Sequence, residues 1–423
     1  MHIVIATVGS LGDLFPFLAV GQVLARRGHR VTVATHEVHR GAVEQAGLHF
    51  ADASGMPEPE DRAAFTAKAF HPWRGPAFVV RDFAAADVRA SYAKLAPVCA
   101  GADLLITSTL AFAGQILGET GEVAGRLRWL SAVLAPASFL SAHDMPVTGI
   151  GLVDALVRHS PARGRALQWL ARRVTHGWTA PVRAFRRELG LPAQSPLGDP
   201  FHRGQHAPRG VLALYPAQLG APQPDWPPNV QLCGFARYAQ PADMEPGLRA
   251  FLDAGAPPLV FSLGSTAVHA NASFLRESLQ AALILGQRAV LCTGSAEMRA
   301  AALPSDLPST IYCVDYAPHA QLFPRASVVV HHGGIGTSAE ALCAGVPMLV
   351  VPHGFDQPDN AARLIRLGVA QSLPAARYRA ARAAALLTQL HAPACRARAR
   401  ALAAALAGDG ALAAADRVEA ALV

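Results

Sequence analysis

The chain has 423 residues, of which 52% are apolar and only 16% are charged. This length exceeds one ordinary domain, so we expect two or three, and the low charge excludes a mainly disordered protein. The net charge of +7 comes almost entirely from arginine, because Lys68 and Lys94 are the only lysines. No nucleic-acid recognition motif accompanies these arginines, so the composition favours anionic small molecules over DNA or RNA as partners.

The first fifty residues alternate apolar strand, glycine turn and helix, which is typical of a βαβ unit. The expected elements of the first half are strand His2–Val8, turn Gly9–Asp13, helix Phe17–Arg27, and strands Arg30–Thr35, Asp103–Thr107 and Leu127–Ser131. Helical stretches between these strands indicate a doubly wound parallel sheet. We therefore predict an α/β N-terminal domain over residues 1–215.

A basic, tryptophan-containing helical stretch covers residues 158–187 and holds eight arginines. Two alternatives remain open for it. It can rest on anionic lipid while the protein takes up an amphiphilic molecule, or it can be an ordinary solvated helix face.

Clustered prolines predict an interdomain linker over residues 216–245. After it the strand pattern restarts, at Leu259–Leu263, Ala289–Thr293, Ile311–Val314 and Ser327–His331. We predict a second α/β domain over 246–400 and a final helix, 401–423, that packs back onto the first domain.

The cysteines, the N-terminal segment and the lengths of the apolar runs indicate the cellular compartment. The six cysteines are widely separated and include no C-x-x-C pair, which favours reduced thiols over disulfides or a zinc site. The N-terminal segment lacks a basic region before its apolar residues, and no apolar run approaches the roughly 20 residues of a spanning helix. We therefore predict a cytoplasmic protein, soluble or peripheral at the inner membrane face.

The most informative segment, residues 328–340, is a buried strand that ends in a glycine turn before a helix. Such a turn directs backbone N–H groups and the positive helix end at one point, which suits a phosphate oxygen. His332 and the hydroxyls of Thr337 and Ser338 can complete this cradle. The alternative is tight strand–helix packing with no ligand.

The longer stretch HHGGIGTSAEALCAGVPMLVVPHGFDQPDN, residues 331–360, resembles the donor-binding motif of the family 1 nucleotide-sugar glycosyltransferases. The resemblance covers essentially the whole chain. It implies the GT-B fold, with two facing Rossmann-like domains and a C-terminal helix that returns to the first domain.

The resemblance assigns donor-binding roles residue by residue. It implies that the diphosphate is bound by His332, Gly334, Gly336, Thr337, Ser265 and Ser10, the base and ribose by Tyr316, His319 and Glu340, and the sugar by Asp356 and Gln357. Plant members carry tryptophan and glutamine at the Tyr316 and His319 positions. Tyr316 can stack on a pyrimidine or be a core aromatic, Glu340 can be a solvated helix residue, and the Asp356–Gln357 pair can be an ordinary polar loop.

The segment Gly9–Pro16 resembles the family's acceptor-side catalytic loop. Many members have histidine at the Asp13 position, whereas bacterial members that glycosylate natural products often have aspartate acting as general base. Partial burial raises the pKa of such a carboxylate towards the working range. The neighbouring strand end offers Ser108 and Thr109 but no carboxylate, which fits aspartate acting directly. The alternative role for Asp13 is a helix N-cap.

The acceptor is expected in the first domain, with Phe15, His71, Trp73, Phe112 and Phe139 as candidate contacts, although each can instead be core. Segments 135–143 and 215–227 also resemble the rhamnosyltransferases of rhamnolipid assembly. No metal is expected, because the adjacent His331 and His332 at a strand end point in opposite directions.

The sequence thus predicts an inverting glycosyltransferase that moves a sugar of rhamnose or glucose type from a UDP- or dTDP-sugar. The acceptor is the hydroxyl of a hydrophobic molecule, either a hydroxyacyl lipid or an aromatic or polyketide natural product. The nucleotide-sugar is a co-substrate, and no cofactor is expected. Two alternatives remain: a dinucleotide-dependent oxidoreductase, suggested by Gly9-x-x-Gly12 with Glu37, and a non-catalytic sugar-nucleotide-binding protein.

Overall fold

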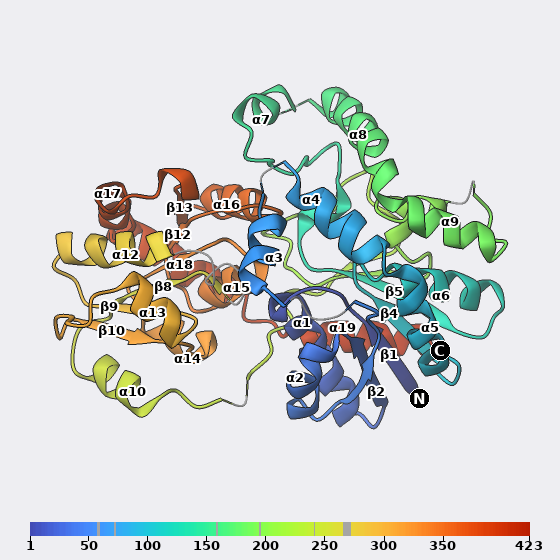
Figure 1. Ribbon diagram of the computed structural model, residues 1–423, viewed down its shortest axis with the longest axis horizontal. Coiled ribbons are helices and arrows are strands. Elements are labelled where there is room, and N and C mark those ends of the chain that lie inside the picture. The colour runs from blue at the N-terminus through green and yellow to red at the C-terminus, as the bar shows by residue number, and fades with distance from the viewer. Residues whose placement is uncertain (57–59, 72, 158–159, 194–195, 241, 265–271) are drawn as a thin grey trace. The chain divides into compact units, whose positions relative to one another are not determined.

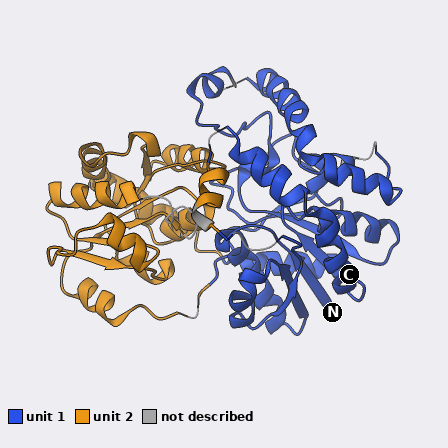
Figure 2. Ribbon diagram, viewed as in Figure 1, with its two compact units in different colours: residues 1–60, 71–238, 409–423 blue, residues 61–70, 239–408 orange. Residues whose placement is uncertain are grey.

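A computed structural model describes residues 1–423 except 57–59, 72, 158–159, 194–195, 241 and 265–271, and the side chains of 62, 63, 157 and 196. The chain divides into two compact units (Figure 2). Unit 1 comprises residues 1–60, 71–238 and 409–423, and unit 2 comprises 61–70 and 239–408. The predicted α/β class, with two doubly wound domains, is confirmed.

Unit 1 is built on a seven-stranded parallel sheet of order β3-β2-β1-β4-β5-β6-β7 (Figure 1). Its strands are β1 His2–Ala6, β2 Arg30–Thr35, β3 His49–Asp52, β4 Leu104–Thr107, β5 Arg128–Val133, β6 Val211–Ala213 and β7 Val230–Leu232. Its longer helices are α1 Leu11–Arg26, α2 Arg40–Gln45, α5 Val88–Cys99, α6 Phe112–Val123, α7 Gly151–Val157, α8 Pro161–His176, α9 Ala180–Glu188 and α19 Gly410–Leu422, and the short α4 Gly75–Ala77 leads into a π-helix at Phe78–Ala85.

Unit 2 contains a six-stranded parallel sheet of order β10-β9-β8-β11-β12-β13. Its strands are β8 Leu259–Ser262, β9 Ala289–Cys292, β10 Ile311–Val314, β11 Val328–His331, β12 Met348–Val350 and β13 Ala370–Ser372. Its helices are α3 Arg62–Ala69, α10 Pro246–Asp253, α12 Ala272–Ile284, α13 Ala296–Ala302, α14 His319–Leu322, α15 Ile335–Cys343, α16 Gln357–Arg366, α17 Ala380–Leu390 and α18 Pro393–Ala405.

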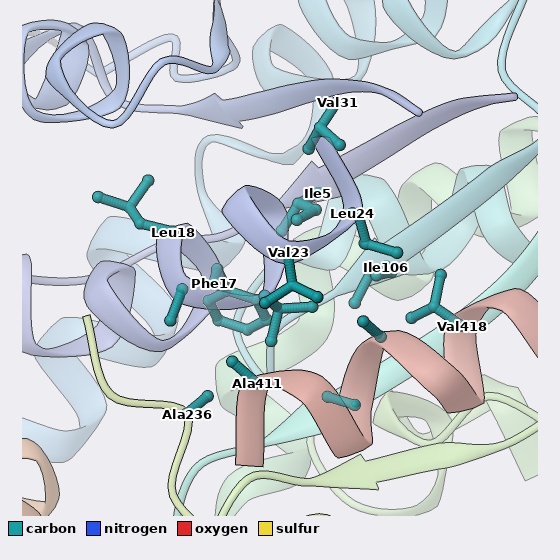
Figure 3. Packing of buried hydrophobic residues seen from close by; sticks show 14 of the residues in the cluster. Ile5, Phe17, Leu18, Val23, Leu24, Val31, Ile106, Ala236, Ala411 and Val418 are labelled. Carbon is teal, nitrogen blue, oxygen red and sulfur yellow. The ribbon is translucent and has the colours of Figure 1, made fainter. Parts of the chain in front are cut away.

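The core of unit 1 explains why the last helix leaves unit 2. Phe17 and Leu24 of α1 are buried in one cluster with Ile5 of β1, Ile106 of β4, and Ala411 and Val418 of α19 (Figure 3). At the start of α19, Gly410 lies so close to Gly234 that a Cβ would stand 2.5 Å from its carbonyl. The return of the C-terminal helix to the first domain is therefore built into a shared apolar core.

Three boundaries differ from the sequence expectation. Strand β7 lies inside the proposed linker 216–245, and unit 2 begins at residue 239. Helix α18 runs across the proposed boundary at 400–401, so only 409–423 return to unit 1. Residues 61–70, expected in the N-terminal domain, belong to unit 2, because Phe70 packs its ring edge against Phe355 with centroids 5.1 Å apart.

Candidate active site

Each sheet has one point where its strand order reverses, between β1 and β4 in unit 1 and between β8 and β11 in unit 2. In open α/β sheets, ligands bind at the carboxyl ends of the strands beside this switch point. Asp13 lies in the first turn of α1, directly after the β1 loop, and His332 lies in the loop that follows β11. The topology therefore brings the predicted base and the predicted phosphate contact to the switch point of their own sheets.

Asp13 occupies the third position of α1, directly against the turn after β1. Gly9 has φ +145°, and a Cβ on it would lie 2.4 Å from Asp13 Oδ2, so only glycine leaves room for this carboxylate. The backbone N–H and the hydroxyl of Ser10 both donate to Asp13 Oδ2, at 2.8 and 2.9 Å. Ser10 is the N-cap residue of α1, so the N-cap role considered for Asp13 belongs to its neighbour.

Burial raises the pKa of Asp13, and the opposing effects of the two Ser10 hydrogen bonds and of nearby His39 are smaller. Both Ser10 bonds go to Oδ2, so Oδ1 is the oxygen left to take a proton. The donors of Ser10 are committed to this carboxylate, which leaves the diphosphate role expected for Ser10 without a described donor group. At the end of β4, Ser108 Oγ accepts a hydrogen bond from the Val8 N–H at 3.2 Å.

His39 supports the same loop and was missed by sequence reasoning. Its side chain is buried, and its Nε2 donates to the Gly9 carbonyl at 3.0 Å. The carbonyl can only accept, so Nε2 carries the proton. The signal lay in the topology, because His39 follows β2, which pairs directly with β1.

The candidate acceptor residues lie in separate environments. Phe112 is 1% exposed and belongs to the core formed with Ile116 and Val182, so its assignment as an acceptor contact is corrected. Phe15 packs on the main core of unit 1 beside Tyr238, with ring centroids 5.4 Å apart. Phe112 lies on the side of α6 that packs against other helices, since its cluster includes Val88 of α5 and Val182 of α9.

The other three candidates are divided between packing and exposure. Phe139 is stacked between Trp226 and His206, with ring centroids at 4.2 and 5.3 Å. The exposed His71 accepts hydrogen bonds at Nδ1 from the N–H groups of Trp73 and Arg74. Trp73 itself is 74% exposed. It is therefore the large apolar side chain of this set that remains open for contact with a ligand.

In unit 2 the imidazole of His332 is held between two glycines. A Cβ on Gly264 would lie 2.6 Å from His332 Cε1, and one on Gly334 would lie 2.3 Å from Nε2. Burial, helped by the proximity of His353 and His319, lowers the pKa of His332 to about 3. The ring is therefore neutral, and its buried Nδ1 has no hydrogen-bond partner among the residues the structure describes.

The first turn of α15 lies next to this ring. The N–H groups of Ile335, Gly336 and Thr337 precede the first intrahelical bond, which Ser338 N–H makes to Gly334 O at 3.0 Å. Three donors thus converge at the positive helix end, as an anion site requires. The hydroxyl of Ser338 donates to the same Gly334 carbonyl at 2.9 Å, so it does not contribute to the cradle. Ser265 lies outside the described residues.

The residues expected to bind base and ribose differ in how available they are. Tyr316 is 55% exposed, and its hydroxyl donates to Gln240 Oε1. Burial raises the pKa of Tyr316, with a smaller contribution from the charge of Glu340. His319 is instead stacked on Phe323 at 4.3 Å. Its Nε2 is bonded to Ser262 Oγ at 3.1 Å, so this ring supports the site through packing.

The expected sugar-binding pair is tied to the phosphate loop through Asn360. Its Nδ2 donates to the Gly333 carbonyl at 3.0 Å and to Asp356 Oδ2 at 2.7 Å. Gln357 Oε1 accepts from the N–H groups of His353 and Gly354, at 2.8 and 3.2 Å. The buried amide of Asn360 therefore connects the phosphate loop to Asp356, and sequence reasoning had given this residue no role.

Within the part of the chain that the structure describes, no three histidine, cysteine, aspartate or glutamate residues form a group suited to a metal ion. The six cysteines are unpaired thiols, and burial raises the pKa of Cys99 to about 12. Among the described helices, none is both long and apolar enough to cross a bilayer.

Comparison with known proteins agrees with this arrangement. Residues 3–128 match the model of the glycosyltransferase family 28 N-terminal domain, and residues 289–414 match the erythromycin biosynthesis protein CIII-like C-terminal domain. A relative from Streptomyces fradiae, O-mycaminosyltylonolide 6-deoxyallosyltransferase, is 34% identical and covers 97% of this chain and 94% of its own.

Solved structures show the same fold. The glycosyltransferase of kitacinnamycin aligns with a TM-score of 0.68 at 24% identity, and VinC in complex with dTDP with 0.66 at 21% identity. Each alignment covers 100% of this chain and 99% of the other. The oxidoreductase alternative is not favoured by these relatives, and Glu37 forms an exposed ion pair with Arg40. The chain therefore belongs to the family 1 nucleotide-sugar glycosyltransferases of the GT-B fold, and it is a glycosyltransferase of the bacterial natural-product type.

Proposed function

We propose that this enzyme transfers a 6-deoxyhexose of the rhamnose type, with inversion, from a dTDP-sugar to a hydroxyl of a hydrophobic natural product. Asp13 is the general base, and no metal ion takes part. The observation that carries the proposal is the seating of Asp13 on Gly9, where burial raises the pKa of a carboxylate that Ser10 holds in place.

The proposed chemistry starts at Asp13 Oδ1. This oxygen takes the proton of the acceptor hydroxyl while the hydroxyl oxygen forms a bond to the anomeric carbon from the face opposite the diphosphate. The carbon–oxygen bond to the diphosphate breaks, and the electron pair leaves on the phosphate oxygen. A carboxylate whose pKa lies above its solvated value is a stronger base for this step.

The leaving diphosphate is proposed to bind at the first turn of α15. Three backbone N–H groups and the neutral imidazole of His332 can donate to its oxygens as negative charge develops there. Because Gly264 and Gly334 fix the ring, these dipoles need little reorganisation during the reaction. Tyr316 is proposed to stack on the pyrimidine base and Glu340 to accept from the ribose hydroxyls.

The sugar preference is inferred from the surroundings of Asp356 and Gln357. Phe355 precedes them with φ +56° and an exposed ring, against which Phe70 packs at 5.1 Å. A phenyl group beside the sugar-binding pair suits a C6 methyl group better than a hydroxymethyl group. The Streptomyces fradiae relative is named as a 6-deoxyallosyltransferase, and the VinC structure contains dTDP, which supports the same class of donor.

The acceptor class is proposed on similar grounds. The relative's name describes a glycosylated tylonolide acceptor, and the exposed Trp73 offers an apolar contact in unit 1. We favour a polyketide-type natural product, with hydroxyacyl lipids as the second class. The enzyme is proposed to work in the cytoplasm and to reach the membrane only as a peripheral protein.

The test combines binding and turnover with the purified full-length chain. Thermal stabilisation should be larger with dTDP than with UDP at equal concentration, since a ligand at 100 times its Kd stabilises by about 2.7 kcal/mol. Transfer from dTDP-rhamnose should exceed transfer from dTDP-glucose, and Phe355→Ala should narrow that preference about tenfold. A preference for UDP, or for glucose in the wild type, would contradict the donor assignment.

A further inference from the structure

Helices α7 and α8 of unit 1, which pack against each other, carry an unusual concentration of exposed apolar side chains. Figure 1 shows both helices apart from the strands of their unit. We call these exposed side chains the apolar ridge: Ile150 just before α7, Leu152 and Leu156 of α7, and Trp169, Leu170 and Val174 of α8. Leu152 is 74% exposed and Trp169 is 57% exposed. Such clusters on soluble proteins usually mark interaction sites.

The face of α8 opposite the apolar ridge packs against other parts of unit 1. Gly164 faces the Ala142 carbonyl, which would lie 2.4 Å from an added Cβ. One turn further, Gln168 donates to the Leu140 carbonyl, and Thr175 Oγ1 is bonded to His202 Nε2 at 2.8 Å. Trp169, Leu170 and Val174 lie on the opposite side at helical spacing. One face of α8 therefore packs within unit 1, and the side that carries Trp169, Leu170 and Val174 stays exposed.

The charged side chains of α8 are all arginines. Arg163, Arg165 and Arg173 are exposed on α8, and the guanidinium of Arg173 stands 4.3 Å from the centre of the Trp169 ring. The only acid between residues 145 and 187 is Asp154. Its carboxylate accepts from Thr148 N–H at 2.7 Å and from Gly149 N–H at 3.1 Å, so it is used within its own loop. Apolar side chains here are flanked by cations.

We propose that the apolar ridge docks on an anionic lipid bilayer. An interfacial helix places its apolar side chains in the acyl boundary while arginines meet the phosphate groups, and this combination of residues matches both layers. Helix α8, 16 residues or about 24 Å long, is too short and too charged to span. A symmetric second copy would face arginine with arginine, so charge complementarity favours lipid. This inference names the surface for the peripheral membrane contact proposed above. It does not depend on whether the protein transfers a sugar.

The test is vesicle co-sedimentation of the full-length enzyme. It should bind vesicles of phosphatidylglycerol mixed with phosphatidylcholine, bind pure phosphatidylcholine vesicles weakly, and lose affinity as salt is raised. Arg163→Gln with Arg165→Gln should weaken binding about 25-fold, at about fivefold per charge. Trp169→Ala with Leu170→Ala should weaken it roughly tenfold or more. Val123→Ser, at an 84% exposed valine on α6, is the matched control and should leave binding unchanged.

Two further measurements identify the occupant. Tryptophan emission should shift to the blue on adding anionic vesicles, and Trp169→Phe should remove most of the shift. Equal vesicle binding by wild type and ridge variants, or no binding at all, would overturn the proposal. So would a dimer in sedimentation velocity that the Trp169→Ala, Leu170→Ala variant dissolves. Transfer to a water-soluble acceptor without vesicles should be normal in all ridge variants, so failure here and failure of the proposed function are distinguishable.

Discussion

The switch points of the two units use one physical effect in opposite directions. In unit 1 burial raises the pKa of the Asp13 carboxyl, and in unit 2 burial lowers the pKa of the His332 imidazole to about 3. Burial disfavours the charged form in both cases. The acid thereby becomes a better proton acceptor, and the imidazole becomes a neutral hydrogen-bonding group. One topology thus supplies a site suited to taking a proton and a site suited to holding an anion.

The strongest test of this comparison is Asp13→Asn. Asparagine keeps the size of the side chain and an oxygen for the Ser10 hydrogen bonds, but it cannot take the proton. Removing a general base costs about 10²–10⁴ in rate, so single-turnover transfer at saturating donor should fall by that factor while dTDP affinity is retained. Near-normal transfer would mean that the Asp13 carboxylate only stabilises the start of α1.

The corresponding test in unit 2 is His332→Ala. Loss of a hydrogen bond to the diphosphate should weaken dTDP binding by about 1–3 kcal/mol, measured by calorimetry. His331→Asn is a useful comparison, because His331 Nδ1 accepts from the Gly333 N–H at 3.1 Å and shapes the same turn. If His332→Ala binds dTDP as the wild type does and is folded, the ring is a packing residue between its two glycines.

A third variant separates sugar from diphosphate in unit 2. Asp356→Asn keeps an oxygen for the Asn360 hydrogen bond but removes the carboxylate, so turnover should fall about tenfold with free dTDP affinity nearly unchanged. Asn360→Ala is the control for loop position and should affect both quantities, since Asn360 also holds the Gly333 carbonyl. Loss of dTDP affinity in Asp356→Asn alone would place this residue at the wrong part of the donor.

The raised pKa of Asp13 in unit 1 should make the free energy of unfolding depend on pH. Between the unfolded and the higher folded pKa of Asp13, the native state binds more protons, so this residue's contribution to stability falls as pH rises. In denaturant titrations, the free energy of unfolding of Asp13→Asn should therefore gain on that of the wild type as pH rises above about 3.9, the ordinary pKa of aspartate. If the free energy of unfolding of the wild type instead gains on that of Asp13→Asn as pH rises, folding lowers the pKa of Asp13 and the carboxylate stabilises the native state.

The smallest expected effect concerns His39→Gln. Glutamine can still donate to the Gly9 carbonyl, but it removes a positive charge that lowers the pKa of Asp13. The acid limb of the pH profile of kcat/KM should therefore shift to higher pH, while the rate on the plateau stays within a few-fold of the wild-type rate. An unchanged limb with a large loss of rate would make the hydrogen bond, and not the charge, the contribution of His39.

Sequence reasoning succeeded where one segment held all the relevant information. The strand–glycine–helix segment after β11 is continuous in the chain, so its loop and the first turn of α15 could be predicted directly. Contacts between distant segments were not accessible. His39 reaches Gly9 only through the pairing of β1 with β2, and Phe70 reaches Phe355 across nearly three hundred residues.

Short elements and side-chain direction account for other differences. Strand β7, three residues among prolines, has too little pattern to be distinguished from a linker. Phe112 begins a helix whose buried face could not be assigned from residue type alone, and Ser338 looked equivalent to Thr337 until its hydroxyl was seen bonded within its own helix. Which face a side chain occupies is set by packing, and packing depends on the whole unit.

The exchange of segments between the units has a consequence for engineering hybrid enzymes. The chain passes from one unit to the other at residues 60–61, 70–71, 238–239 and 408–409. A chimera joined only at 238–239 would bring a foreign last helix to α1 and lose the contacts of Glu419 with Arg27 and His29, at 2.7 and 2.9 Å. It would also separate Phe70 from its partner Phe355. Donor units should therefore be exchanged as residues 61–70 together with 239–408, with the native α19 retained.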